Sequence, residues 1–168
     1  MNEAPGSFAT FAELEAALPM LRAAPREQGR LEMIVCRPAR DAREVLEAAE
    51  LRAGAGLTGD RWTASSRGEP LTLTSSRLIG LLARTRERWP LAGDQLYVDF
   101  DLCAEHLPPG TRLAIGSAVI EISPEPHAPC RKFRDRYGAD ALRFVARSEE
   151  HTSELQALAY LVCRLLLE

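Results

Sequence analysis

Cys130 is the residue whose neighbours favour chemistry most clearly. It lies in the stretch PHAPCRKF (126–133), where prolines hold the backbone extended and basic side chains follow the thiol. Arg131 and Lys132 come directly after it, and neighbouring cations lower the pKa of a cysteine and favour its thiolate. His127, three residues earlier, is a candidate proton partner. The pattern predicts a reactive cysteine between a strand and a basic helix.

A thiolate at position 130 is compatible with three chemistries. It can ligate a metal ion, attack a carbonyl carbon or a peroxide, or carry a sulfur atom as a persulfide. No cysteine-protease signature accompanies it, and the candidate resolving cysteines, Cys36 and Cys103, lie in no comparable polar motif. The alternative is a surface or half-buried cysteine with incidental basic neighbours. The local residues alone do not separate these interpretations.

The loop GLTGDRW (56–62) is a second polar motif. Gly56 and Gly59 allow the backbone to approach a bound group closely, and Asp60 and Arg61 can present charge there. The loop is therefore a candidate binding segment. The alternative is a tight turn in which the Asp-Arg pair stabilises only the turn itself.

The remaining cysteines give weaker signals. Cys36 ends the apolar run LEMIVC and is expected to be a buried core thiol. Cys103 and His106 have the spacing of half a metal site, but no second pair follows at zinc spacing, so a zinc site is not expected. The cysteines are scattered and form no CxxC pair, which is typical of reduced thiols in a cytoplasmic protein.

The composition limits the class of protein. The chain has 168 residues, of which 46% are hydrophobic and 27% charged, and this suits one domain with a proper core. The formal net charge of −3 argues against a general nucleic-acid binder, which needs a net basic face. No apolar run reaches the roughly 20 residues that a membrane helix needs, and no secretory signal is recognisable. We therefore expect a cytoplasmic protein with neither nucleic acid nor membrane as a partner.

Periodicity and turn residues predict a β-rich chain with few helices. Thr10 and Glu13 have the form of a capping box before a helix that Pro19 should kink. Gly116 and Ser117 have the form of a two-residue hairpin loop. The expected helices cover about 11–23 and 76–89, and the expected strands cover 31–36, 43–51, 71–74, 95–102, 111–115 and 118–123.

These elements favour a closed or partly closed antiparallel barrel over a layered α/β sheet, because the strands are short, evenly spaced and separated by glycine turns. Within the barrel, the run 95–102 alternates apolar and polar residues, so it is expected to be a half-buried strand.

Residues 147–168 differ in character from the rest of the chain. They resemble the in-frame translation of a sequencing-library adapter, and the segments that carry this resemblance are RSEEHTSELQ and LVCRLLL. The resemblance implies that the natural sequence ends near Ala146 and that His151 and Cys163 have no evolved role. Leucines that gather on one side of the tail predict an amphipathic helix there.

Five motifs occur in an order that resembles the MOSC domain, which is found at the C-terminus of molybdenum cofactor sulfurases and as small stand-alone bacterial proteins. They are GLTGDRW (56–62), LTLTSSR (71–77), GDQLYVDFDL (93–102), LPPGTRLAIGSAVIEIS (107–123) and PHAPCRKFRDRYGADALRFV (126–145). The chain is most similar to short stand-alone members that carry an N-terminal helical extension.

The resemblance implies a β-rich α+β fold, with a MOSC-like antiparallel β-barrel and a few flanking helices. It divides the chain into an N-terminal helical extension (1–30), the barrel domain (31–146) and the tail (147–168). The family continues after RFV with further strands, where this chain carries the adapter-like tail. The last strands of the barrel are therefore expected to be missing.

The resemblance also implies a role for the PHAPCRKF cysteine. Cys130 matches the essential family cysteine, which either receives sulfur as a persulfide from a pyridoxal-phosphate-dependent desulfurase or binds molybdenum directly. Arg131 and Lys132 are the expected contacts to the phosphate of the pterin cofactor. His127 matches a common family position.

The glycine-rich loop matches the family's cofactor-binding loop at Gly56, Gly59, Asp60 and Arg61. Trp62 stands where many members carry histidine, so an imidazole function is absent there. One alternative within the family is a molybdenum-dependent reductase of N-hydroxylated compounds, which would need an electron-donating reductase as a partner. A second alternative is a non-catalytic module that only binds the cofactor.

Overall fold

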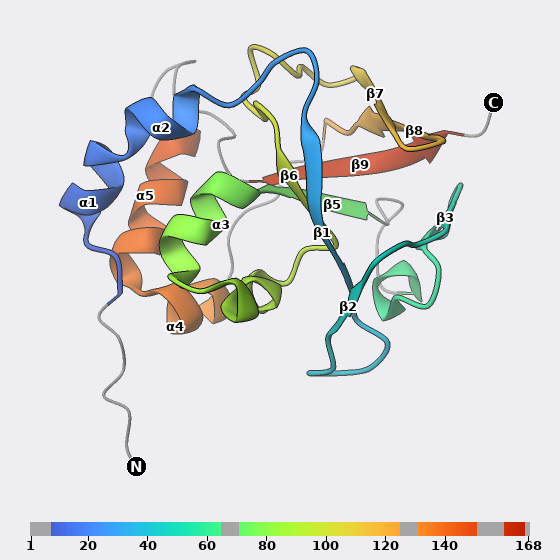
Figure 1. Cartoon of the computed structure of the whole chain (residues 1–168), viewed down its shortest axis with the longest axis horizontal. Coiled ribbons are helices and arrows are strands. Elements are labelled where there is room, and N and C mark those ends of the chain that lie inside the picture. Colours follow the sequence, from blue (N-terminus) through green and yellow to red (C-terminus); the bar gives the residue numbers. More distant parts are fainter. Residues whose placement is uncertain (1–7, 65–70, 125–130, 151–159, 167–168) are drawn as a thin grey trace.

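A computed structural model describes residues 8–64, 71–124, 131–150 and 160–166 (Figure 1). A mixed β-sheet lies beside a layer of helices, so the chain has the expected β-rich α+β fold. The helices are α1 (Phe11–Ala16), α2 (Leu18–Arg22), α3 (Ser76–Ala83), α4 (Arg131–Tyr137) and α5 (Ala139–Glu150), with 3-10 helices η1 (Arg61–Ala64) and η2 (Arg86–Ala92).

Seven strands form the main sheet, in the order β2-β1-β6-β5-β9-β8-β7. Their bounds are β1 (Arg30–Cys36), β2 (Glu44–Leu46), β5 (Leu71–Ser75), β6 (Leu96–Asp99), β7 (Arg112–Ile115), β8 (Ala118–Ile122) and β9 (Tyr160–Leu166). Two short strands, β3 (Leu51–Arg52) and β4 (Gly56–Leu57), pair with each other separately. The strand expected over 43–51 is therefore divided between β2 and β3.

The sheet is not purely antiparallel as expected. β5 pairs with β6 in parallel, because the chain between them crosses over through α3 and η2. Every other strand pairing in the described residues is antiparallel. The order ends with β2 and β7, and no pairing joins these two strands in the ranges that the structure describes.

The local signals at the N-terminus and at the hairpin are confirmed. The Glu13 backbone N–H donates to the Thr10 hydroxyl over 3.3 Å, and the Thr10 N–H donates to the Glu13 carboxylate over 2.7 Å, which is the capping box. The helix breaks at Ala17, two residues before Pro19, as a proline near the start of α2 requires. Ile115 of β7 faces Ala118 of β8 across the two-residue loop.

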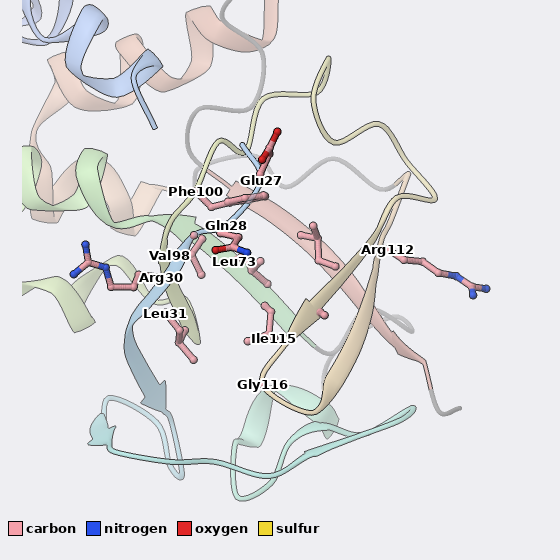
Figure 2. A pocket seen from close by; sticks show the side chains of 13 residues that line it. Glu27, Gln28, Arg30, Leu31, Leu73, Val98, Phe100, Arg112, Ile115 and Gly116 are labelled. Atoms are coloured by element: carbon pink, nitrogen blue, oxygen red, sulfur yellow. The ribbon is translucent and has the colours of Figure 1, made fainter. Parts of the chain in front are cut away.

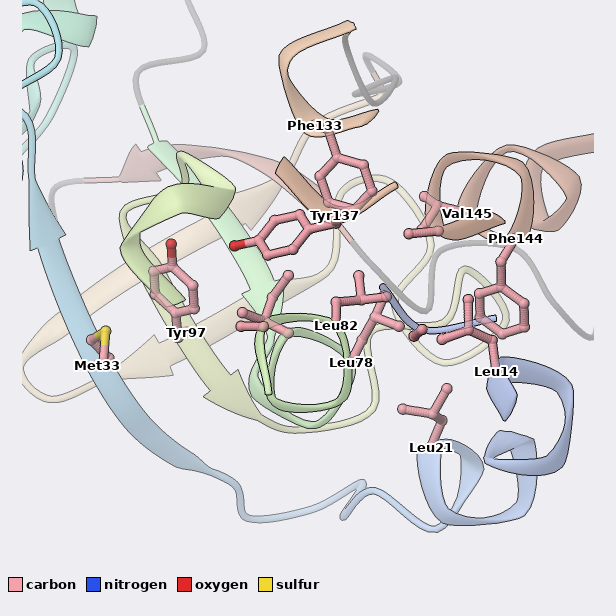
Figure 3. Packing of buried hydrophobic residues seen from close by; sticks show 14 of the residues in the cluster. Leu14, Leu21, Met33, Leu78, Leu82, Tyr97, Phe133, Tyr137, Phe144 and Val145 are labelled. Carbon is pink, nitrogen blue, oxygen red and sulfur yellow. The ribbon is translucent and has the colours of Figure 1, made fainter. Parts of the chain in front are cut away.

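The helices bury their apolar faces against one side of the sheet (Figure 3). Leu14 of α1 and Leu21 of α2 pack in the same cluster as Leu78 of α3, Tyr137 of α4 and Phe144 of α5. The N-terminal helices therefore share the core of the domain that follows them. The second helix is shorter than expected, because it ends at Ala83 and the chain continues as η2.

The strand expected to be half-buried is buried on both faces. Tyr97 of β6 packs against the helical layer, whereas Leu96 and Val98 pack in a second cluster on the opposite side of the sheet. The half-buried prediction was wrong, because α3 and η2 cover the face that carries Tyr97. That hydroxyl is satisfied by a 2.9 Å hydrogen bond to the Trp89 carbonyl.

The tail contains a strand where a helix was expected. β9 lies between β5 and β8 and pairs with both in antiparallel register, with Leu73 opposite Leu161 and Ile120 opposite Leu165. A short apolar run suits a buried strand as well as a helix, and the two neighbouring strands offer it backbone partners on both sides. The helical prediction for this stretch is therefore wrong, and β9 fills a central place in the sheet.

Candidate functional site

The two residues expected to carry the chemistry, His127 and Cys130, lie outside the described residues. The structure resumes at Arg131, which with Lys132 begins α4 and is exposed to solvent. Phe133 and Tyr137 anchor this short helix in the core, and the Tyr137 hydroxyl donates to the Arg88 carbonyl over 3.1 Å. The two cations are thus held on the surface by a helix with a buried apolar side.

The glycine-rich loop has a backbone that requires glycine. Gly56 and Gly59 have φ angles of +74° and +86°, in the left-handed region that side chains disfavour. A Cβ atom on Gly59 would lie 3.6 Å from the Cys36 Sγ atom. That distance is an ordinary van der Waals contact, so the positive φ angle, and not a lack of space, is what favours glycine at position 59. Cys36 is buried there as expected, and burial raises the pKa of its thiol, with the nearby Asp60 carboxylate raising it further.

Asp60 turns its carboxylate inward, toward Arg37 at the end of β1. The Arg37 side chain donates from Nε to Oδ2 over 3.0 Å and from Nη2 to Oδ1 over 3.1 Å. Two backbone N–H groups complete the arrangement, that of Arg37 at 2.8 Å and that of Trp62 at 2.7 Å. The Asp60 side chain is 0% exposed and that of Arg37 is 12% exposed. Asp60 therefore fixes the loop to β1 through Arg37.

Arg61 remains at the surface of the same loop. Its backbone N–H donates to the Arg37 carbonyl over 3.0 Å, and its Nε donates to the Ala39 carbonyl over 3.2 Å. Trp62 lies against Arg37, with the guanidinium carbon 5.3 Å from the ring centroid. The backbone of Arg61 is thus fixed, while its exposed guanidinium is available to an anion at the loop surface.

Arg37 connects the loop to α4. Its Nη1 donates to the carbonyl of Gly93, which precedes β6. Arg136 of α4 approaches the same glycine, since a Cβ atom on Gly93 would lie 3.8 Å from the Arg136 Nη1. That Nη1 donates to the Leu91 carbonyl over 2.6 Å. Segments far apart in sequence, the GLTGDRW loop and the helix that follows Cys130, therefore meet around Gly93.

Cys103 and His106 both contact Asp101. The Cys103 thiol donates to the Asp101 carboxylate over 3.3 Å, and the His106 Nδ1 lies 2.8 Å from the Asp101 carbonyl oxygen. Arg26 binds the same carboxylate through its Nε over 2.7 Å. Burial raises the pKa of the Cys103 thiol, and the hydrogen bond to Asp101 raises it further, so the thiolate is disfavoured. No group of three or more metal-ligating side chains occurs in the part of the chain that the structure describes.

The concave side of the sheet holds a cavity of about 540 Å³ (Figure 2). Leu31 of β1, Val98 of β6 and Ile115 of β7 line it, with Arg30 and Arg112 also among the lining residues. A second cavity of about 880 Å³ shares Leu31 and Ile115 with the first. The sheet is therefore curved enough for β1 and β7, which do not pair, to face each other across one space.

No family model and no curated protein matches this chain, whereas solved structures do. One, described as a hypothetical protein, matches with a TM-score of 0.57 and 17% identity over 88% of this chain and 64% of its own. The YuaD protein from Bacillus subtilis matches with a TM-score of 0.52 and 15% identity, over 82% of this chain and 87% of its own. At these identities the likeness concerns the fold alone. The chain spans 64% of the length of the first structure.

The described helices include none that is both long and apolar enough to cross a membrane.

Proposed function

We propose that this chain is a MOSC-type protein of the molybdenum cofactor, in which Cys130 carries sulfur as a persulfide or ligates the molybdenum. The observation that supports this is the meeting of two motifs at Gly93. Arg37 binds Asp60 of the glycine-rich loop and the Gly93 carbonyl, and Arg136 of the helix after Cys130 lies against the same glycine. The MOSC resemblance implies that the glycine-rich loop binds the cofactor and that the other motif carries the reactive thiol. A shared site requires that these two motifs lie together.

Three exposed basic residues support a role in binding the phosphate end of a pterin cofactor. Arg61, Arg131 and Lys132 are all exposed, and charge-assisted hydrogen bonds from such groups to phosphate oxygens are strong. Asp60 has a positioning role in this proposal and does not contact the cofactor itself, because its carboxylate holds Arg37 and the loop in position. Molybdenum, when bound through the pterin, supplies oxygen-atom and electron transfer. The protein ligand for it in this proposal is the Cys130 thiolate.

In sulfur transfer, Cys130 takes the terminal sulfur atom of a persulfide from a cysteine of a partner protein. The Cys130 thiolate attacks the terminal sulfur of a persulfide on the pyridoxal-phosphate-dependent desulfurase. The sulfur–sulfur bond of the partner breaks, its cysteine leaves as a thiolate, and the new bond forms at Cys130. His127 accepts the thiol proton before attack. Arg131 and Lys132, which follow Cys130 directly in the sequence, would stabilise the thiolate and the anionic persulfide.

The proposal includes a MOSC-like barrel as the scaffold. The curvature of the sheet supports this, since Leu31 of β1 and Ile115 of β7 line one cavity although their strands do not pair (Figure 2). Closure of the space between these strands would complete a barrel with the helices on its outside.

Molybdenum content tests the ligand role of Cys130. We expect the full chain, co-expressed with the enzymes of cofactor synthesis, to contain molybdenum and pterin, and Cys130→Ala to lose most of the molybdenum. Cys103→Ala is the matched control. It also removes a thiol, but that thiol donates a hydrogen bond to Asp101. Elemental analysis and pterin fluorescence provide the two measurements. Equal molybdenum in all three proteins would contradict the ligand role.

A further inference from the structure

Two strand edges border the cavity of about 540 Å³ on the concave side of the sheet (Figure 2). β7 is the last strand in the sheet order, and β2 pairs with β1 only over residues 34–36. Within the ranges that the structure describes, residues 30–33 of β1 therefore have no strand on the side away from β6. Runs of consecutive residues from both edges, 27–31 and 112–116, line the cavity. Successive side chains of a strand point to opposite faces, so such runs indicate that the backbone edges themselves border the space.

The hairpin register shows which backbone groups of β7 face this space. The Ile122 N–H donates to the Thr111 carbonyl over 2.9 Å, and hydrogen-bonded pairs recur at every second residue of an antiparallel ladder. Ile115 and Ala118, beside the loop, are by this alternation a hydrogen-bonded pair as well. Ala114 lies between these positions, so its backbone N–H and C=O point away from β8. They lie at the open edge.

The floor of the cavity between the two edges is apolar. Leu73 of β5 and Val98 of β6 are buried beneath it, and Leu31 of β1 and Ile115 of β7 add apolar surface from either side (Figure 2). Leu31 is 39% exposed and also lines the neighbouring cavity of about 880 Å³. An extended peptide fits such a place, because its backbone can pair with the edges while every second side chain covers the floor.

The strands on either side of the cavity run in the same direction. Residues 27–31 and 112–116 line the first cavity, whereas the second cavity is lined further along both strands, by Ile34 of β1 and by the loop residues Gly116 and Ser117. Residue numbers therefore rise together along the two edges. A strand placed between them is either parallel to both or antiparallel to both, and antiparallel pairs are the commoner kind.

We propose that the space between β1 and β7 is a docking site for an extended segment of a partner protein, which joins the sheet as a strand antiparallel to both edges. Its backbone pairs with the open edges, including the N–H and C=O of Ala114, and its alternate apolar side chains cover Leu31 and Ile115. A small apolar ligand would cover the floor but leave both edges unpaired, so a peptide backbone fits the site better. The site depends neither on molybdenum nor on Cys130.

The site is tested with a short synthetic peptide of alternating threonine and valine, blocked at both termini and labelled with fluorescein. A glutamate at each end suits Arg30 and Arg112, whose side chains are 81% and 60% exposed. Fluorescence anisotropy with the full chain should show saturable binding. We expect N-methylation of either the central valine or the threonine beside it to reduce the affinity about tenfold or more. Neighbouring N–H groups of a strand point to opposite edges, so the two methylated peptides test the pairing with β1 and with β7 separately.

Two variants at one position test the β7 edge. Ala114→Pro removes the backbone N–H that faces the cavity, whereas Ala114→Val keeps this N–H and suits a strand. Because that N–H takes no part in the pairing with β8, we expect both variants to unfold close to the wild-type thermal midpoint. Only Ala114→Pro should lose peptide affinity, by about tenfold. If Ala114→Pro does not fold, the methylated peptides still test the same pairing on the unaltered protein.

Three results would overturn the proposal. The first is a wild-type chain that does not bind the peptide. The second is equal binding of the parent and both methylated peptides, which would show a groove that holds apolar side chains without pairing. The third is a loss of affinity with only one methylated peptide, or a folded Ala114→Pro that binds like the wild type, since either result contradicts insertion between two strands.

Discussion

Asp60→Ala is expected to reduce the free energy of unfolding by about 3–5 kcal/mol, the usual cost of removing one partner from a buried ion pair. The carboxylate is fully buried and accepts from the Arg37 side chain and from two backbone N–H groups. Without it, a guanidinium that is only 12% exposed loses its counterion, and the Trp62 N–H loses its acceptor. Urea unfolding followed by circular dichroism measures the loss.

Two further variants sharpen the Asp60 prediction. Glu105→Ala removes an exposed carboxylate, and should change the free energy of unfolding by no more than about 0.5 kcal/mol. The double variant Arg37→Met with Asp60→Leu removes both charges, and should recover much of what the single variant lost. If Asp60→Ala unfolds at the same urea concentration as the wild type, Asp60 does not fix the loop to β1.

Leu14→Ala is expected to reduce the free energy of unfolding by about 2–5 kcal/mol, because it leaves a cavity in the core. Leu14 belongs to the N-terminal helical extension, yet it is 0% exposed and packs in one cluster with Leu78, Tyr137 and Phe144 (Figure 3). The extension is therefore part of the folding unit. Chemical unfolding monitored by circular dichroism should show one transition, shifted to lower urea concentration.

Met20→Ala is the control for this prediction, since Met20 lies on α2 of the same extension but is 42% exposed. Its effect should be much smaller than that of Leu14→Ala. A Leu14→Ala variant with wild-type stability, or a separate early transition for the N-terminal helices, would show that the extension does not belong to the same folding unit as the domain.

Elements with local signals could be predicted from the sequence. The capping box of Thr10 and Glu13, the break near Pro19 and the hairpin loop at Gly116 all depend on residues next to each other in the chain. Local hydrogen bonds and backbone preferences decide such features, so the sequence pattern was sufficient for them.

Features that depend on distant partners could not be predicted in this way. The alternating run around Tyr97 indicated a half-buried strand, but α3 and η2 cover its second face. The parallel pairing of β5 with β6 follows from a crossover that strand spacing does not report. The apolar run of β9 is compatible with a helix or a buried strand, and its partners β5 and β8 decided between them.

The glycine-rich loop of the candidate site also shows that sequence patterns do not report distant partners. The sequence indicated a special backbone role for Gly59, and its φ angle of +86° agrees with that. Asp60 was a candidate to present charge to a bound group, with a self-contained turn as the alternative. Its carboxylate instead pairs with Arg37, which the motif analysis overlooked. The only sequence signal for Arg37 was its place directly after the apolar strand, where a charged side chain can turn back toward the core.

The sulfur-carrier role of Cys130 is tested most directly by peptide mass spectrometry. The full chain is incubated with a pyridoxal-phosphate-dependent desulfurase and cysteine, digested, and compared with a sample treated with a thiol reductant. We expect one additional sulfur atom on the peptide that contains Cys130, removed by the reductant and absent from the peptides of Cys36 and Cys103. An unmodified Cys130 under desulfurase turnover, or equal modification of all three cysteines, would contradict the sulfur-carrier role.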